Sequence, residues 1–278
     1  MSSFTPFQSS LVTVAVILGA MAAVALIETV VPLHARSRWS KLHLGPNLAL
    51  TFMAFATNAL FNVALVMTLI RLQSSGFALL PRLALPSLAS GAIAVLMLDL
   101  SFYAAHVAMH KTDGLWRFHR VHHSDPAVDV TTTIRQHPGE GVIRYAFMAV
   151  FAAAVGATPG AFAVYRLWSV LAGLLEHANV RTPRRLDDLL SLVVTTPNMH
   201  KVHHSRTAAE TDTNYGNIFS LFDRLFSTFT PAARGVSIVC GLDGYDDRGW
   251  QTTAGLLALP FRDVTAPHGT ALVAEEHS

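Results

Sequence analysis

Charged residues are scarce in this chain of 278 residues: Asp, Glu, Lys and Arg make up 14%, whereas hydrophobic residues make up 51%. A folded domain in water needs more charged side chains than this to cover its surface. The formal net charge is only +2, and the basic residues are scattered, so the concentrated positive surface that nucleic acid requires is missing. The composition argues against nucleic-acid binding and indicates lipid as the solvent for much of the chain.

Cysteine is almost absent, because Cys240 is the only one in the chain. A single cysteine excludes an internal disulfide framework and any metal site built from several thiolates. The sequence also lacks a G-x-G-x-x-G motif after an expected strand, a cysteine set for an iron–sulfur cluster and a haem-domain signature. Any redox chemistry would therefore need a separate electron donor, either a reductase or ferredoxin or a soluble reductant.

Long apolar runs dominate the first two thirds of the chain, at residues 11–31, 47–70, 88–109, 142–156 and 161–175. A membrane helix needs about 20 apolar residues, and only the last two runs are shorter than this. The turn Ala157-Thr158-Pro159-Gly160 predicts that these two form a helical hairpin. We predict an all-α integral membrane bundle of about four to five membrane helices over residues 1–178. A helical cap over residues 179–278 completes the same functional unit.

Basic residues suggest the orientation of this bundle. Arg36, Arg38 and Lys41 follow the first run, and Lys111, Arg117, Arg120 and Arg135 follow the third. The positive-inside rule places both connections, and with them the cap, in the cytoplasm. Five crossings satisfy this orientation, although Arg71 and Arg82 lie in the opposite connection. A hairpin at 142–175 that enters the membrane without crossing it is the alternative.

Histidine is unusually frequent, with fourteen in the chain, and eight of them form three groups. The first has the spacing H-x-x-x-H and the other two have H-x-x-H-H; the groups are His106 and His110; His119, His122 and His123; and His200, His203 and His204. Residues three or four apart lie on one face of a helix, so each group directs its imidazoles to one side. Such repeated spacing is not a product of chance.

Imidazole nitrogen binds first-row transition metals, whereas magnesium and calcium prefer oxygen ligands. A structural zinc site needs only four ligands. Eight histidines therefore indicate two metal ions, and two ions in one pocket indicate redox or hydrolytic chemistry. The isolated His34, His43, His268 and His277 are interpreted as polar tips in wet interfacial surroundings, without a role.

The order and flanks of these groups resemble the fatty acid hydroxylase and sterol desaturase superfamily of integral-membrane di-iron enzymes. The resemblance covers roughly residues 96–229 and includes LWRFHRVHHS, RQHPGE and NYGNIFSLFDRLFSTF. It implies that the eight grouped histidines bind the metals and take part in catalysis. It also implies two iron ions, for which zinc can substitute in purified protein.

Two further histidines lie in motifs of this family. His177 in LLEHANV stands where fatty acid hydroxylases carry an additional H-x-x-x-H pair, although Arg181 replaces the second histidine. We expect His177 to be a ninth ligand, with a supporting or packing role as the alternative. His137 in RQHPGE is either a residue at the metal site, as a ligand or beside the ligands, or a plain interfacial residue.

Carboxylates are expected to support the ligands, because a metal-bound imidazole usually donates its other N–H to a carboxylate or carbonyl. The candidates are Asp99, Glu140, Glu176 and Asp223. Asp99 is favoured, because it lies two helical turns before His106 on the same face. Its alternative is a carboxylate that lines a wet cavity or caps a packing contact, and that of Asp223 is an ion pair with Arg224.

The predicted function is a membrane-bound, O2-dependent oxidoreductase that hydroxylates or desaturates an apolar lipid, of the fatty acyl, sterol, alkylglycerol or carotenoid type. The lipid would enter from the bilayer between helices. Arg117, Arg120, Arg135 and Lys201 are candidates for docking an acidic electron carrier, with membrane-surface charge as the favoured alternative. A metal-dependent membrane hydrolase and a histidine-rich metal storage or transport protein remain alternative functions.

Overall fold

The computed structural model describes residues 6–76 and 79–262, and within these ranges the chain is helical and forms no strand beyond isolated bridges. The α-helices are α1 Pro6–Val30, α2 Trp39–Leu42, α3 Leu44–Ser74, α4 Leu79–Arg82, α5 Ser87–Lys111, α6 Asp113–His123, α7 Pro138–Val155, α8 Pro159–His177, α9 Arg184–Leu190, α10 Pro197–His203, α11 Ala208–Thr211, α12 Leu221–Leu225 and α13 Thr253–Ala258. The 3-10 helices are η1 Val130–Ile134, η2 Ala232–Ser237 and η3 Leu259–Phe261. The predicted all-α class is confirmed.

Five long helices, α1, α3, α5, α7 and α8, correspond to the five predicted apolar runs. The predicted hairpin between the last two is also formed. Gly156 ends α7 with a positive φ of 69°, a backbone conformation that glycine adopts without steric cost. Thr158 then caps α8, because its hydroxyl accepts a hydrogen bond from the Ala161 amide at 3.0 Å.

Four stretches are long and apolar enough to cross a membrane, and the second of them runs across residues 77–78, which lie outside the described ranges. They are Leu11–Val30, Leu44–Arg82, Ser87–Lys111 and Pro138–Val155. The helix α8 does not meet the same criterion, so a fifth crossing stays a prediction. The chain is therefore an integral, multi-pass membrane protein.

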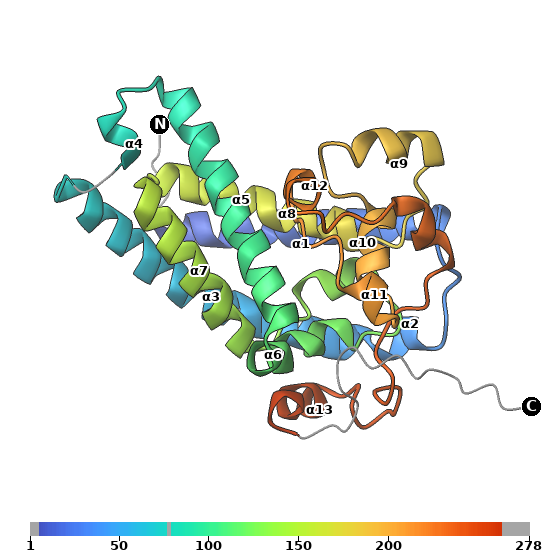
Figure 1. The fold of residues 1–278 in the computed structure, drawn as a ribbon. Coiled ribbons are helices and arrows are strands. Elements are labelled where there is room, and N and C mark those ends of the chain that lie inside the picture. The colour runs from blue at the N-terminus through green and yellow to red at the C-terminus, as the bar shows by residue number, and fades with distance from the viewer. Residues whose placement is uncertain (1–5, 77–78, 263–278) are drawn as a thin grey trace, which may run out of the picture.

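The long helices form a bundle with two distinct ends (Figure 1). The N-terminal ends of α1, α5 and α8 lie at one end, together with the C-terminal ends of α3 and α7. The opposite ends lie toward α6 and the segments from α9 onward, which pack there as a cap. The first two histidine groups and His177 stand at the cap end of the bundle, because they occupy the last turns of α5, α6 and α8.

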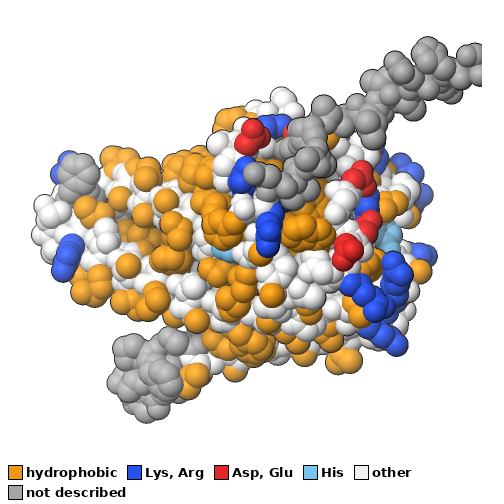
Figure 2. Space-filling model, turned by 90° about the horizontal axis from the view of Figure 1, so that it is seen from below, with side chains coloured by type: hydrophobic (Ala, Val, Ile, Leu, Met, Phe, Trp, Pro, Cys, Tyr) orange, Lys and Arg blue, Asp and Glu red, His pale blue; other side chains and the backbone are white. Residues whose placement is uncertain are grey.

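Two buried clusters hold the bundle together. One joins α3, α5, α7 and α8 through side chains that include Leu69, Leu98, Met148 and Tyr165. The other packs α1 against α3, η1 and α8 and includes Met21 and Leu174. The outward sides of the same helices stay apolar: Figure 2 shows hydrophobic side chains over most of the visible bundle, whereas charged side chains gather mainly over the cap half. This surface suits a bilayer around the helices.

A carboxylate within α5 binds the cap to the bundle through hydrogen bonds. The Asp99 side chain is 1% exposed and accepts hydrogen bonds from the backbone amides of Ile218 and Phe219, at 3.3 and 3.1 Å. A neighbouring carboxylate, Asp223, accepts from the amides of Tyr215 and Gly216 at 2.7 and 2.8 Å. The segment 215–219 is thereby held between two acidic side chains, one from the bundle and one from α12.

We expect Asp99→Ala to lower the free energy of unfolding by about 2–4 kcal/mol, because it leaves two buried amides without an acceptor. Asp99→Asn keeps one acceptor oxygen and should cost less. Thermal unfolding of the detergent-solubilised protein measures both. An unchanged melting temperature in Asp99→Ala would contradict this account.

Candidate metal centre

The end of α5 and the whole of α6 bring two histidine groups face to face. Thr112 takes an extended conformation, with φ −127° and ψ 112°, and turns the chain from α5 into α6. His106 and His110 occupy the last turns of α5, and His119, His122 and His123 occupy the last turns of α6. All five imidazoles are buried.

The third group comes from the cap. Pro197 occupies the first turn of α10, and the Thr196 hydroxyl accepts a hydrogen bond from the Met199 amide at 3.3 Å, so the short helix begins with a side-chain cap. His200 and His203 lie on α10, and His204 follows as its C-cap. From the bundle, α8 ends with His177 beside them.

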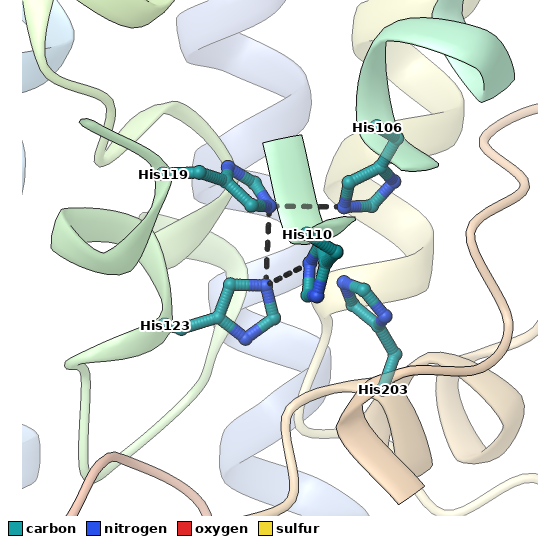
Figure 3. A group of neighbouring side chains, drawn as sticks. All are labelled: His106, His110, His119, His123 and His203. Carbon is teal, nitrogen blue, oxygen red and sulfur yellow. Dashed lines mark hydrogen bonds between the residues drawn. The ribbon is translucent and has the colours of Figure 1, made fainter. Parts of the chain in front are cut away.

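The nine predicted ligands come together in two adjoining groups. In each group one side-chain nitrogen per residue lies within 4.8 Å of all the others: His106, His110, His119, His123 and His203 form group A, and His122, His177, His200 and His204 form group B. Figure 3 shows the rings of group A directed toward a common point. The groups adjoin, since the ring centroids of His123 and His204 are 4.6 Å apart.

Short contacts between Nε2 atoms define the centre of each group. In group A, His119 Nε2 lies 3.0 Å from His106 Nε2 and 3.1 Å from His123 Nε2, which in turn lies 3.2 Å from His110 Nε2 (Figure 3). In group B, His177 Nε2 lies 3.0 Å from the Nε2 atoms of both His122 and His200.

The opposite nitrogen of several rings is fixed by an acceptor. His106 Nδ1–H donates to the Tyr215 carbonyl, His203 Nδ1–H to the Thr213 carbonyl and His177 Nδ1–H to the Gly173 carbonyl, each at 2.8 Å. A carbonyl only accepts, so the proton of each neutral ring must be on Nδ1. The Nε2 atoms that face the centre then carry lone pairs and no proton.

Carboxylates lie beside the Nδ1 atoms of two other rings. His119 Nδ1 lies 3.1 Å from Glu140 Oε1, and His110 Nδ1 lies 3.2 Å from Asp212 Oδ1. The contact of His119 with Glu140 does not have hydrogen-bond geometry, so it does not fix the tautomer of His119. His106 presents a lone pair at the 3.0 Å contact between the two Nε2 atoms, and a cation there could bind both rings.

Other observations fit a metal ion in each group. The Nε2 atoms of His203 and His204 are buried without a hydrogen-bond partner. Burial, followed by the neighbouring imidazoles, holds the pKa values of His119, His123 and His204 well below their usual range, so the rings are neutral and able to bind a metal. Metal–nitrogen bonds are about 2.1 Å long, so nitrogen atoms that lie about 3 Å apart could reach one ion.

The predicted supporting residues have different positions. Glu140 contacts His119, and Arg144 Nε donates to the same Glu140 oxygen at 2.7 Å. Glu176 Oε1 lies 3.5 Å from His177 Nδ1 and 4.0 Å from His200 Nε2. These two carboxylates lie at the centre, one beside each group.

The other three lie farther from the rings. The hydrogen bonds of Asp99 and Asp223 go to the backbone of 215–219 and, for Asp223, also to the Thr228 hydroxyl, so the predicted contact with a ligand histidine is not formed among the described residues. Their link is indirect, because the Tyr215 carbonyl of this segment accepts from His106. His137 is outside both groups and caps α7, where its Nδ1 accepts from the Gly139 amide at 2.9 Å.

Residues that the sequence did not reveal complete the support. The backbone carbonyls of Thr213 and Tyr215 hold His203 and His106, and Asp212 holds His110. All three lie in or just before the NYGN stretch. A backbone carbonyl carries no signal in residue identity, and only the resemblance of that stretch to a family motif pointed to it.

The interpretation of His43 as a water-facing interfacial side chain is wrong. His43 is fully buried, its Nδ1 lies 2.9 Å from Asp125 Oδ1 and its Nε2 lies 3.2 Å from Asp129 Oδ2. Burial alone would lower the pKa of His43, but the charge of Asp125 and the hydrogen bonds to both aspartates raise it to about 10. His43 is thus a buried cation that ties the start of α3 to the loop after α6. His34 is half-buried, with Nε2 3.0 Å from the Gly235 carbonyl, and His268 and His277 lie outside the described residues.

Three of the basic residues considered for docking an electron carrier are inside the protein. Arg135 and Lys201 are fully buried, and Arg120 is 7% exposed. Lys201 Nζ donates to the carbonyls of Val128 and His177, and Arg120 donates to the carbonyls of Leu259 and Arg262. These side chains cannot form a docking surface, and the prediction was wrong for them; Arg117 is exposed.

A cavity of about 790 Å³ reaches both groups from within the bundle. Its wall comes from α1, α3, α5, α7 and α8 and is mainly apolar. His106, His122, His177 and His200 line its inner end, where the two groups adjoin. A cavity of this size can bury a lipid chain and bring a carbon atom to the imidazoles.

Known proteins resemble the part of the chain that carries the histidine groups. Residues 91–228 match the fatty acid hydroxylase family model, and this segment contains all nine histidines. Ornithine lipid hydroxylase OlsE of Rhizobium tropici is 32% identical over 171 residues, which cover 61% of this chain and 49% of that protein. Alkylglycerol monooxygenase of Danio rerio is 32% identical over 141 residues, 50% of this chain and 30% of that protein.

The human alkylglycerol monooxygenase is 28% identical over 151 residues, 54% of this chain and 32% of that protein. The chain thus spans half or less of the length of these curated relatives. No solved structure matches it.

We expect Glu140→Ala to weaken metal binding about 10- to 100-fold, because His119 loses the carboxylate that lies 3.1 Å from its Nδ1. Glu140→Gln keeps an acceptor oxygen and should weaken it less. Metal retention against increasing chelator, measured by elemental analysis, compares the variants. Equal retention in Glu140→Ala and the unchanged protein would show that Glu140 does not support a ligand.

The buried His43 cation predicts a pH-dependent stability. Its folded pKa of about 10 exceeds the ordinary value of 6.5, so its contribution is complete below about pH 6.5 and declines as the pH rises toward 10. His43→Gln should therefore destabilise the protein strongly at pH 7, and its deficit should shrink by pH 10. Melting temperatures of both proteins across this range test the sign; a constant or growing deficit would contradict it.

Proposed function

Because this chain belongs to the fatty acid hydroxylase family, we propose that it is a membrane-embedded oxygenase that hydroxylates a lipid with dioxygen and external electrons. The observation that carries the proposal is the pair of adjoining histidine groups with ring nitrogens directed inward, at the end of an apolar cavity. A storage or transport site needs no such cavity. A hydrolase would need no external electrons, and oxygen dependence separates it from the oxygenase.

We propose that the two groups hold two iron ions, one in group A and one in group B. Nitrogen-only ligand sets suit iron, while zinc and copper accept the same donors. When bound, a reduced iron pair supplies the dioxygen chemistry needed to attack an unactivated C–H bond. The electrons would come from a separate protein or soluble reductant.

Residues of the chain hold the ligand rings, the lipid chain and a proton donor or acceptor in place. The carbonyls of Tyr215, Thr213 and Gly173 hold three ligand rings in one tautomer, and Glu140 lies beside a fourth. The apolar cavity wall excludes water and positions an aliphatic chain. Glu176 lines the cavity beside group B and has one oxygen without a partner, so its carboxylate is placed to take or give a proton near the substrate.

The lipid character of the substrate follows from the cavity and from the relatives. Two of these are named for ornithine lipid and alkylglycerol, and both names describe insertion of oxygen. We propose hydroxylation over desaturation for this reason. We also propose that the metal site faces the cytoplasm, because Arg36, Arg38 and Lys41 lie in a connection at the cap end.

The experiment is the comparison of lipid extracts from cells with and without the protein, with product mass as the readout. We expect a lipid gain of one oxygen that requires dioxygen. His122→Ala should lower its formation at least about 100-fold, because it removes a group B ligand that also lines the cavity. Membrane insertion and melting temperature of the variant control for folding.

His34→Ala is the matched control, since His34 lies outside both groups. Its product level should match that of the unchanged protein. Full turnover in a folded His122→Ala protein would refute the ligand assignment, and product formation without oxygen would refute the oxygenase.

A further inference from the structure

A half-buried arginine lines the apolar cavity without a carboxylate partner. Arg166 is on α8 and contributes to the cavity wall together with Tyr145, whose ring centroid lies 5.2 Å from the guanidinium carbon. Its Nε is buried and has no hydrogen-bond partner. Among the residues that the structure describes, none forms an ion pair with Arg166.

A second arginine in the same cavity shows the contrast. Arg144 on α7 pairs with Glu140 at 2.7 Å, and its guanidinium carbon lies 4.2 Å from the Phe102 ring centroid. Its charge is therefore balanced within the protein, although its Nη1 is buried without a partner. Arg166 has no such balance. An arginine inside a membrane-embedded bundle is costly unless an anion or a polar pathway stabilises it.

Donor groups near Arg166 point to an oxygen-containing ligand. The Tyr145 hydroxyl donates to Asn62 Oδ1 at 2.6 Å, which uses the acceptor of this amide. The Asn62 NH2 group donates no hydrogen bond to a described residue, and Asn62 also lines the cavity. Arg166 and Asn62 thus offer hydrogen-bond donors and no free carboxylate on this part of the wall.

The positive Arg166 and the acidic Glu176 lie far apart along α8. Glu176 is the carboxylate of the wall, and it lies ten residues after Arg166, about 15 Å farther along the helix axis. It stands at the histidine end. An anionic group at Arg166 would therefore avoid the carboxylate of Glu176 and lie far from the reacting carbon.

We propose that the cavity binds a lipid through an anionic oxygen group, a carboxylate or a phosphate, that pairs with Arg166. The aliphatic chain of the lipid then extends along the apolar wall to the imidazoles of both groups. Guanidinium matches these anions because its N–H groups form two parallel hydrogen bonds to two oxygens. The orientation of the chain rests on the proposed function, whereas anion binding does not.

The test is equilibrium binding to the full-length protein in detergent, without oxygen or reductant, so that a failure to oxygenate cannot affect it. One ligand pair is a spin-labelled fatty acid and its methyl ester; the other is a lysophosphatidic acid and the matching monoacylglycerol. We expect the anion of at least one pair to bind about ten-fold more tightly than its neutral partner. The pair that shows the preference identifies carboxylate or phosphate.

Variants show which residue causes the preference for the anionic lipid. R166Q should abolish the preference and leave the affinity for the neutral lipid unchanged, while R166K should retain part of it. R71Q, at an exposed arginine outside the cavity, is the matched control and should behave as the unchanged protein. Equal binding of anion and neutral lipid in both pairs, which needs no variant, would overturn the proposal. So would a full preference in folded R166Q.

Discussion

The metal centre depends on the hydrogen bonds that fix the outer nitrogen of the imidazoles. The carbonyls at the Nδ1 atoms of His106, His177 and His203 keep the ring proton on the outside of the groups, so the Nε2 atoms of these rings face the centre as lone pairs. A metal ion in each group would therefore contribute to the stability of the fold as well as to chemistry, because the ligands come from four segments of the chain.

The rest of the structure brings these segments together. The helices α5 and α8 deliver ligands at the cap end of the bundle, and α10 brings three more from the cap. Asp99 and Asp223 hold the segment 215–219 from opposite sides, and His43 holds the loop after α6. Buried charges within the chain thus position backbone carbonyls, and the carbonyls position the imidazoles. The same bundle leaves a cavity that opens onto both groups.

Much of this organisation follows from the sequence, because long apolar runs and repeated histidine spacing are local patterns. The five runs correspond to five helices, and the nine histidines expected as ligands meet in two groups. The sequence could not assign these histidines to the two groups. His122 and His123 are neighbours in α6 yet belong to different groups, since successive residues on a helix point about 100° apart.

The burial of His43, Arg135 and Lys201 was not predicted, for a related reason. Burial of a polar residue depends on partners distant in the chain, as the contact between His43 and Asp125 shows.

The proposed chemistry requires two ions per chain, bound through imidazole nitrogen. Metal analysis with X-ray absorption spectroscopy of the purified full-length protein, reconstituted with iron, measures this most directly. The account predicts two iron ions per chain, each with a first shell of nitrogen and oxygen atoms, and loss of about half the metal when group B loses its ligands. One ion per chain, no ion, or a shell that lacks histidine nitrogen would contradict it.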